Sequence, residues 1–151
     1  MPLIYKIDTK KSLKNKKDFS KLKILVNKDL IKVNNLIKRR LSDDIPLIEL
    51  VSKHVFNAGG KRIRPMLCLA SAKLCDYSDK NIIELAACVE FIHTATLLHD
   101  DVIDNSKKRR GLSTAHEIWG NKSSVLVGDF LLSKSFELMV GVEQTQVLKL
   151  L

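Results

Sequence analysis

The sequence lacks several features that mark secreted or membrane-spanning proteins. Its three cysteines, Cys68, Cys75 and Cys88, form no C-x-x-C pair and are odd in number, which argues against a disulfide framework and favours small buried thiols. No apolar run reaches the roughly 18 residues of a transmembrane helix, since even residues 85–98 contain Glu90. The lysine-rich start has no apolar h-region and fits no signal peptide. These absences predict a cytoplasmic protein with no transmembrane segment.

Positive charge is concentrated at one end of the chain. The 151 residues carry a formal net charge of +9, and residues 1–40 hold eleven Lys and two Arg against three Asp. The excess therefore belongs to an arm and not to the fold. Such an arm can touch nucleic acid or an anionic membrane, but a solvated tail is the commoner case, so we expect no nucleic-acid partner. We divide the chain into an arm, 1–18, and one domain, 19–151.

Helical periodicity and helix-end signals divide this domain into five helices. Apolar residues at three-and-four spacing predict the first helix. Capping residues at 42–44 and a proline begin the second, Gly59-Gly60 ends it, and Pro65 belongs in the first turn of the third. The predicted helices cover residues 19–41, the segment between Pro46 and Gly59, and residues 62–75, 79–104 and 123–140. A polar linker, 105–122, precedes the fifth, and the predicted class is all-α.

An acidic turn closes the fourth predicted helix. At about 100° per residue, His93, Leu97, Asp100 and Asp104 share one stripe, and Asp101 adds a third negative charge. Carboxylates one turn apart repel each other unless a cation lies between them, and they oppose the helix dipole at a C-terminus. A solvated helix end is the alternative. Because the turn itself contains no cation, we predict that Asp100 and Asp104 bind magnesium. Water and phosphate oxygens would complete the coordination shell of the metal.

Two basic stretches flank this turn. Residues 59–65, GGKRIRP, place cations where a helix N-terminus presents free N–H groups, and residues 107–111, KKRRG, follow the acids directly. Either stretch alone is more often a charged surface turn. Together with the aspartates, they predict a site for a diphosphate ester, which metal neutralises and guanidinium forks orient.

Three segments, GGKRIRPMLCLASAKL, EFIHTATLLHDDVIDNSKKRRG and VLVGDFLLSKSFELM, resemble trans-polyprenyl diphosphate synthases, in one register over residues 20–140. The resemblance implies an isoprenoid synthase-type helical bundle in which an allylic diphosphate, held by Mg²⁺, ionises and is attacked by isopentenyl diphosphate. It implies that Asp100 and Asp104 ligate the metal, that Asp101 supports them and that Arg109 contacts the allylic diphosphate. It also implies an isopentenyl diphosphate site formed by Lys61, Arg64, His93 and Arg110.

In such enzymes, bulk just before the first aspartate limits product length. Here Ala95 and Thr96 stand five and four residues before Asp100. Small side chains leave the tunnel open, so the resemblance implies a long product of octaprenyl class for a quinone side chain. The alternative is that Ala95 packs against another helix.

Other residues offer weaker signals. His99 and His116 are interpreted as structural. Asp129 in VGDFLL matches the family pattern, but its spacing does not indicate a role. His99-Asp100 is also the metal pair of HD-domain phosphohydrolases, with His54 as a candidate further ligand. That alternative needs more His and Asp ligands than the sequence suggests.

The family also carries a second aspartate-rich motif, and no DDxxD follows residue 104 here. We therefore expect about the first five helices of the bundle, inactive alone and prone to aggregate through an uncovered apolar face. Three hypotheses compete: a fragment of a split gene, a half-enzyme that assembles with a separately encoded C-terminal half, and a non-catalytic binding subunit. A complete enzyme would be a homo-oligomer.

Overall fold

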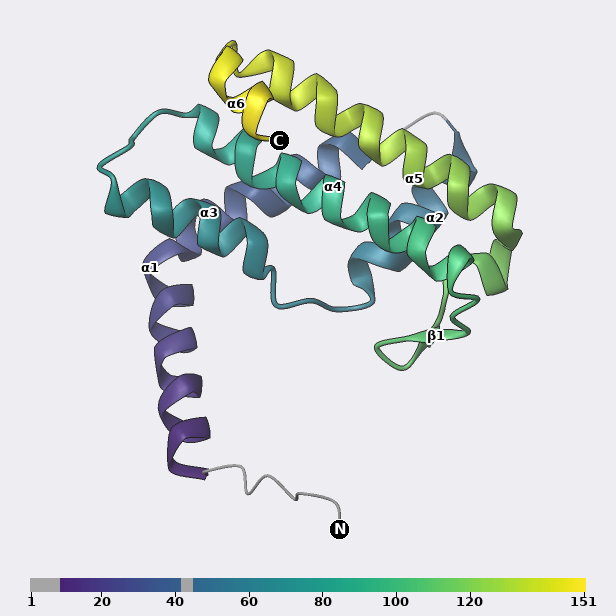
Figure 1. The fold of residues 1–151 in the computed structure, drawn as a ribbon, viewed down its shortest axis with the longest axis horizontal. Coiled ribbons are helices and arrows are strands. Elements are labelled where there is room, and N and C mark those ends of the chain that lie inside the picture. Colours follow the sequence, from purple (N-terminus) through teal and green to yellow (C-terminus); the bar gives the residue numbers. More distant parts are fainter. Residues whose placement is uncertain (1–8, 42–44) are drawn as a thin grey trace.

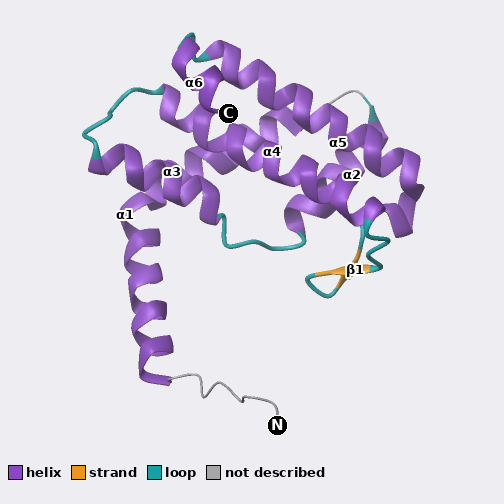
Figure 2. Ribbon diagram, in the orientation of Figure 1, coloured by secondary structure: helices purple, strands orange, loops and turns teal. Residues whose placement is uncertain are grey.

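The computed structural model describes residues 9–41 and 45–151. This part of the chain is helical except for turns and one two-stranded hairpin (Figure 2). The helices are α1 (Thr9–Leu41), α2 (Pro46–Asn57), α3 (Ile63–Leu74), α4 (Asn81–Ile103), α5 (Ala115–Gly141) and α6 (Thr145–Leu150). Strand β1 (Lys108–Arg109) pairs antiparallel with β2 (Leu112–Ser113). The all-α class is confirmed.

Helix α4 forms the centre of the bundle. It packs along α5, while α3 and α1 contact it as well, and α2 packs on α5 (Figure 1). This arrangement explains the sequence of α4, because a helix with neighbours on several sides carries apolar residues on most faces. Phe91 and Leu98 of α4 and Leu131 of α5 are fully buried in the shared core. The first turns of α1 project away from the bundle (Figure 1).

The close approach of α4 and α5 depends on one glycine. A Cβ added at Gly128 would collide with the imidazole of His99, so the ring fits only against a bare backbone. Nε2 of His99 lies 3.2 Å from the carbonyl oxygen of Val125 and 3.4 Å from a carboxylate oxygen of Asp129. His99 therefore links the two helices, in agreement with its structural interpretation.

Helix α4 is also the one helix in the described residues that is long and apolar enough to cross a membrane by length and composition. The search of the sequence for long apolar runs did not identify this helix as a candidate span, because Glu90 interrupts the run. Its buried residues include Glu90 and Asp101, each 5% exposed. Both carboxylates are paired with arginines from other elements, as expected for the core helix of a bundle.

Several predicted boundaries are wrong. Helix α1 begins ten residues before the predicted start, since lysine and leucine are good helix formers and a helix can extend without an apolar stripe. The predicted linker contains the hairpin and the first turns of α5, which the backbone of Gly120 (φ 82°, ψ 161°) interrupts. Helix α6 was not predicted. The predicted caps at 42–44 and residues 1–8 of the arm lie outside the described residues.

Two burial predictions also fail. Leu25 and Val26 both belong to the apolar three-and-four spacing that predicts the first helix, yet Leu25 is 60% exposed, whereas Val26 and Leu30, one turn later, are buried. Cys75 is exposed and Cys68 is half-buried, so only Cys88 is the buried thiol that was predicted for all three. Burial raises the pKa of Cys88 to about 11.

Candidate diphosphate-binding site

The three acids at the end of α4 divide into an inner and an outer set. Asp100 and Asp104 are exposed, while Asp101 is 5% exposed. Asp104 is the C-cap of α4, and its backbone N–H donates to the carbonyl oxygen of Asp100 at 2.8 Å, so the two outer residues keep the spacing of one turn. Within the described residues, no side chain forms an ion pair with either of them. The predicted pair of metal ligands is therefore open to a ligand.

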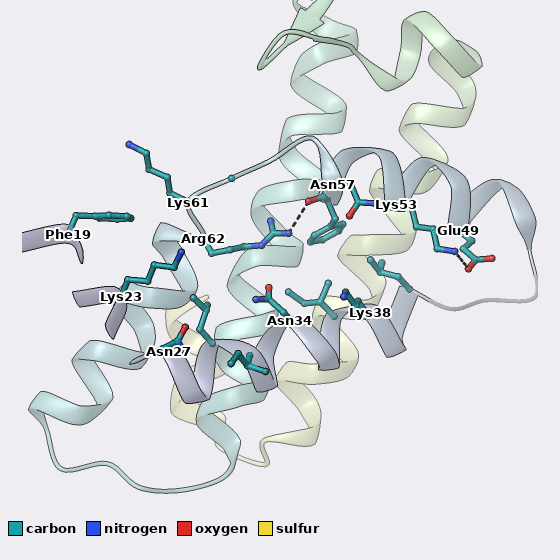
Figure 3. Close-up of a pocket in the computed structure, with 16 residues that line it drawn as sticks. Phe19, Lys23, Asn27, Asn34, Lys38, Glu49, Lys53, Asn57, Lys61 and Arg62 are labelled. Carbon is teal, nitrogen blue, oxygen red and sulfur yellow. Dashed lines mark hydrogen bonds and ion pairs between the residues drawn. The ribbon is translucent and has the colours of Figure 1, made fainter. Parts of the chain in front are cut away.

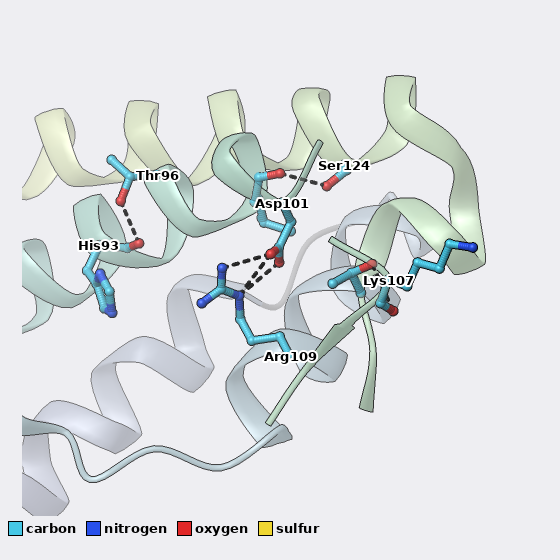
Figure 4. Close-up of polar contacts among 8 residues, drawn as sticks. His93, Thr96, Asp101, Lys107, Arg109 and Ser124 are labelled. Atoms are coloured by element: carbon cyan, nitrogen blue, oxygen red, sulfur yellow. Dashed lines mark hydrogen bonds and ion pairs between the residues drawn. The ribbon is translucent and has the colours of Figure 1, made fainter. Parts of the chain in front are cut away.

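The inner acid is compensated by Arg109 of β1. Nε of Arg109 donates to both carboxylate oxygens of Asp101 at 3.0 Å, and Nη2 donates to Oδ1 at 2.8 Å (Figure 4). Hydrogen bonding to Asp101 raises the pKa of Arg109. This corrects the argument that three acids stand without a cation, because the hairpin supplies one from eight residues away. Arg109 remains 36% exposed and accessible to a ligand.

The hairpin has the backbone of a tight two-residue turn. Lys108 pairs with Ser113 and Arg109 with Leu112, and the two residues between the strands, Arg110 and Gly111, both have positive φ (52° and 84°). A two-residue hairpin of this type requires positive φ at both turn positions. Glycine meets that requirement without strain, whereas Arg110 adopts a conformation that non-glycine residues usually avoid. The turn thus presents two adjacent arginines with different orientations.

The basic stretch after α2 divides in the same way as the acids. Arg62, the N-cap of α3, turns inward, and its Nη1 donates to Oε1 of Glu90 at 2.7 Å. Its Nη2 donates to the carbonyl oxygen of Phe56 at 3.0 Å (Figure 3). Lys61 and Arg64, on either side, are exposed. Sequence reasoning missed Arg62 and Glu90, because 28 residues separate them and neither is distinguished by local spacing.

The two basic stretches meet at Gly60. A Cβ at Gly60 would lie 2.7 Å from Nη1 of Arg110, so this guanidinium rests on the glycine backbone. His93 lines one cavity with Arg110 and another with Arg64. Burial is the main cause that lowers the pKa of His93, and the charges of Arg64, Arg110 and Arg109 lower it further. Glu90 acts in the opposite direction. Of the four predicted isopentenyl diphosphate ligands, the structure therefore brings His93, Arg64 and Arg110 together.

Lys61 is the least closely associated of the four. Its ammonium lies 5.7 Å from the ring centroid of Phe19 in α1, and Figure 3 shows it pointing away from Arg62. It lines a groove of about 880 Å³ between α1, α2 and the loop. None of the three aspartates lines this groove. The chemistry of the acidic turn, and not cavity size, therefore defines the candidate site.

The two predicted product-length residues face different ways. Thr96 lines a cavity of about 480 Å³ between α3 and α4, and its Oγ1 donates to the carbonyl oxygen of His93. Ala95 is 1% exposed in the hydrophobic core, which supports the alternative of helix packing. Ile92 and Val89 line the same cavity as Thr96 and were missed, although spacings of four and seven residues before Thr96 would have found them.

Among the described residues, no group of three or more His, Cys, Asp or Glu side chains could hold a metal ion. Two exposed carboxylates one turn apart suit magnesium only if a phosphate ligand completes the shell. The phosphohydrolase alternative requires a full protein ligand set. His54 instead lies 2.8 Å from the carbonyl oxygen of Ser113 and His99 contacts α5, so neither is placed as that alternative requires. His116 is buried, as a structural residue would be.

These features define a class of protein, a helical bundle in which an acidic helix end lies next to two basic segments. Residues 45–151 match the family model described as polyprenyl synthetase, and the chain belongs to this family. It is 45% identical over 125 residues to the all-trans-nonaprenyl-diphosphate synthase (geranyl-diphosphate specific) of Rhodobacter capsulatus, covering 82% of this chain and 38% of that protein. It is 41% identical over 134 residues to the octaprenyl diphosphate synthase of Escherichia coli (strain K12), covering 89% and 42%.

The fold agrees with solved structures. A polyprenyl synthase from Caulobacter crescentus CB15, complexed with calcium and isoprenyl diphosphate, superposes with a TM-score of 0.85 at 47% identity, covering 87% of this chain and 40% of that one. The predicted family and isoprenoid synthase-type fold are confirmed. The chain spans about 40% of the length of the relatives it matches.

Proposed function

We propose that this chain provides the first aspartate-rich motif and the isopentenyl diphosphate site of a trans-polyprenyl diphosphate synthase. The observation that carries the proposal is the outward pair Asp100 and Asp104, which is one turn apart and next to Arg109. The relatives named above are synthases of octaprenyl and nonaprenyl diphosphate, and one related structure holds calcium with isoprenyl diphosphate. These names support a divalent cation and a long product.

In this function Asp100 and Asp104 would hold Mg²⁺, which supplies neutralising charge as pyrophosphate leaves the allylic substrate. Arg109 stabilises the same developing charge, since its fixed guanidinium is already oriented by Asp101. Lys61, Arg64, His93 and Arg110 hold isopentenyl diphosphate. The open cavity between α3 and α4, with Thr96 in its lining, would receive the hydrocarbon chain. An octaprenyl-type product for a quinone side chain, made by a cytoplasmic enzyme, belongs to this proposal.

A second candidate, a half-subunit that needs a further helical segment, rests on uncovered apolar surface. Among described residues, Leu67 and Leu74 of α3 and Ile103 of α4 are 53%, 86% and 80% exposed. Exposed apolar side chains that a further helical segment covers form an interface. The segment could belong to the same polypeptide, to a separately encoded half or to a second copy in a homo-oligomer.

Calorimetry of pyrophosphate binding with and without Mg²⁺ tests the proposal. In the double variant Asp100→Ala and Asp104→Ala, the Mg²⁺-dependent affinity should fall by at least about 100-fold, since both protein ligands are lost. The matched control, Glu49→Ala with Glu137→Ala, removes two carboxylates from exposed ion pairs and should leave the affinity unchanged. Equal affinity in the wild-type chain and the aspartate variant would overturn the proposal.

A further inference from the structure

Arg62 is unlike the cations around it. Its side chain is 19% exposed and makes three contacts with two helices: Glu90 in α4, the carbonyl oxygen of Phe56 in α2, and the face of the Phe56 ring, 5.2 Å from the guanidinium carbon. Its backbone (φ 50°, ψ 41°) is left-handed, which costs about 1 kcal/mol or more for a residue with a side chain. The surrounding contacts must offset that strain.

Glu90 has an equally unusual environment. Its side chain is 7% exposed on the central helix, and Arg62 is its ion-pair partner at 2.7 Å. Burying a carboxylate costs several kcal/mol, and an ion pair commonly does no better than an apolar pair of the same size. Stability alone therefore gives little reason for this pair. Its geometry, in contrast, determines where the whole loop lies.

The pair fixes the loop that joins α2 to α3. Arg62 bonds the C-terminal turn of α2 and caps α3 with its backbone, while Glu90 ties that point to α4. Lys61 and Arg64, one residue before and two after, are left exposed. His93 stands three residues after Glu90, on a neighbouring face of α4. The Arg62–Glu90 contact thus fixes the segment that carries Lys61 and Arg64 relative to α4, which carries His93.

We propose that Arg62 and Glu90 are positioning residues, which hold the segment 59–64 against α4 so that Arg64 and His93, which line one cavity, face a single diphosphate group. This inference rests on the proposed function, because it concerns the isopentenyl diphosphate site. Neither residue touches the substrate. Their pairing replaces the flexibility expected of a double glycine with one defined loop conformation.

The variant Glu90→Gln tests the inference, since it removes the charge and keeps the size. Affinity for isopentenyl diphosphate, measured by calorimetry, should fall about 10-fold, while Mg²⁺-dependent pyrophosphate affinity at Asp100 and Asp104 stays within about 2-fold. Hydrogen exchange of the amides 59–64 should become at least about 10-fold faster. In Arg62→Lys, which keeps a charge for Glu90 but loses the fork, both effects should be smaller.

Val33→Ala is the control for lost stability, because Val33 is fully buried in α1 and far in sequence from the loop. It should lower the melting temperature without changing the ratio of the two affinities. The inference is overturned if Glu90→Gln leaves isopentenyl diphosphate affinity unchanged, or weakens both ligands equally. If the wild-type chain binds neither ligand, the proposed function fails, and hydrogen exchange still decides: unchanged protection of 59–64 in Glu90→Gln overturns the positioning role.

Discussion

The acidic end of α4 and the basic loop before α3 use the same design with opposite charges. Each has one residue that turns inward to an ion pair, Asp101 or Arg62, and flanking residues of like charge that stay exposed. The pairs differ in reach and burial. Asp101 bonds Arg109 eight residues away, and that arginine is 36% exposed, whereas Arg62 and Glu90 are 28 residues apart and 19% and 7% exposed.

This difference indicates different tasks. The Asp101–Arg109 pair orients a local hairpin, and the arginine remains available to substrate. The Arg62–Glu90 pair joins three helices, and neither of its side chains is available to bind substrate directly. We therefore expect disruption of the buried pair to affect the whole fold, and disruption of the hairpin pair to affect mainly the site.

The largest effect is expected for Glu90→Ala. Removing this carboxylate leaves the largely buried charge of Arg62 without its partner, and loss of one member of a buried pair costs about 3 kcal/mol or more. Urea unfolding of wild type and variant measures the difference. A loss below about 1 kcal/mol would show that Arg62 finds another partner or reaches water, and the contrast between the two regions would then disappear.

Asp101→Asn should cost less, about 1 kcal/mol, because the exposed guanidinium of Arg109 can be solvated when its partner loses charge. The functional effect should be larger than the effect on stability: with Arg109 released, Mg²⁺-dependent pyrophosphate affinity should fall about 10-fold. Urea melts and calorimetry on the same sample separate the two. The exposed pair Lys53–Glu49 is the control, and Glu49→Gln should change neither quantity measurably.

The sequence predicted these two regions unequally. Helical spacing was sufficient to predict that Asp100 and Asp104 lie one turn apart on α4. The order of glycines, cations and proline was sufficient to predict where α3 begins. The inward pairs could not be predicted, because they depend on positive φ values at Arg62 and Arg110 and on contacts between distant elements. The product-length residues illustrate a finer limit. Ala95 and Thr96 are adjacent in sequence, yet the direction of each side chain places only Thr96 at a cavity.

Gly60→Ala tests the contact between the two regions. The added Cβ would meet the end of the flexible Arg110 side chain, so the guanidinium moves and stability changes by less than about 1 kcal/mol. Isopentenyl diphosphate affinity should fall about 3- to 10-fold, because Arg110 is displaced. The sharper comparison is with Gly128→Ala, where the new Cβ meets His99 between packed helices and stability should fall by about 2 kcal/mol with little change in the affinity ratio. Equal behaviour of the two variants would contradict the proposed contact.

The smallest effect is expected from the pH response of His93, which lies where the two regions meet. Burial and the charges of Arg64, Arg110 and Arg109 lower its pKa, and Glu90 only partly opposes them. In the unfolded chain a histidine takes up a proton near pH 6.5, so below about that pH the unfolded state binds a proton that the native state does not. Stability must then fall as pH decreases from about 7 to 5.5, and must level off above that window.

Replacing His93 by Gln removes this contribution. Urea melts at pH 7.5 and 5.5 should show a smaller loss of stability on acidification in the variant than in the wild type, with the other histidines common to both. Bound diphosphate should reverse the balance, because its negative charge favours the protonated ring. Calorimetry of isopentenyl diphosphate in buffers of different ionisation enthalpy should therefore detect proton uptake by the wild type and less by His93→Gln. Identical proton uptake in both chains would place the diphosphate away from His93, and so away from the point where the acidic and basic regions join.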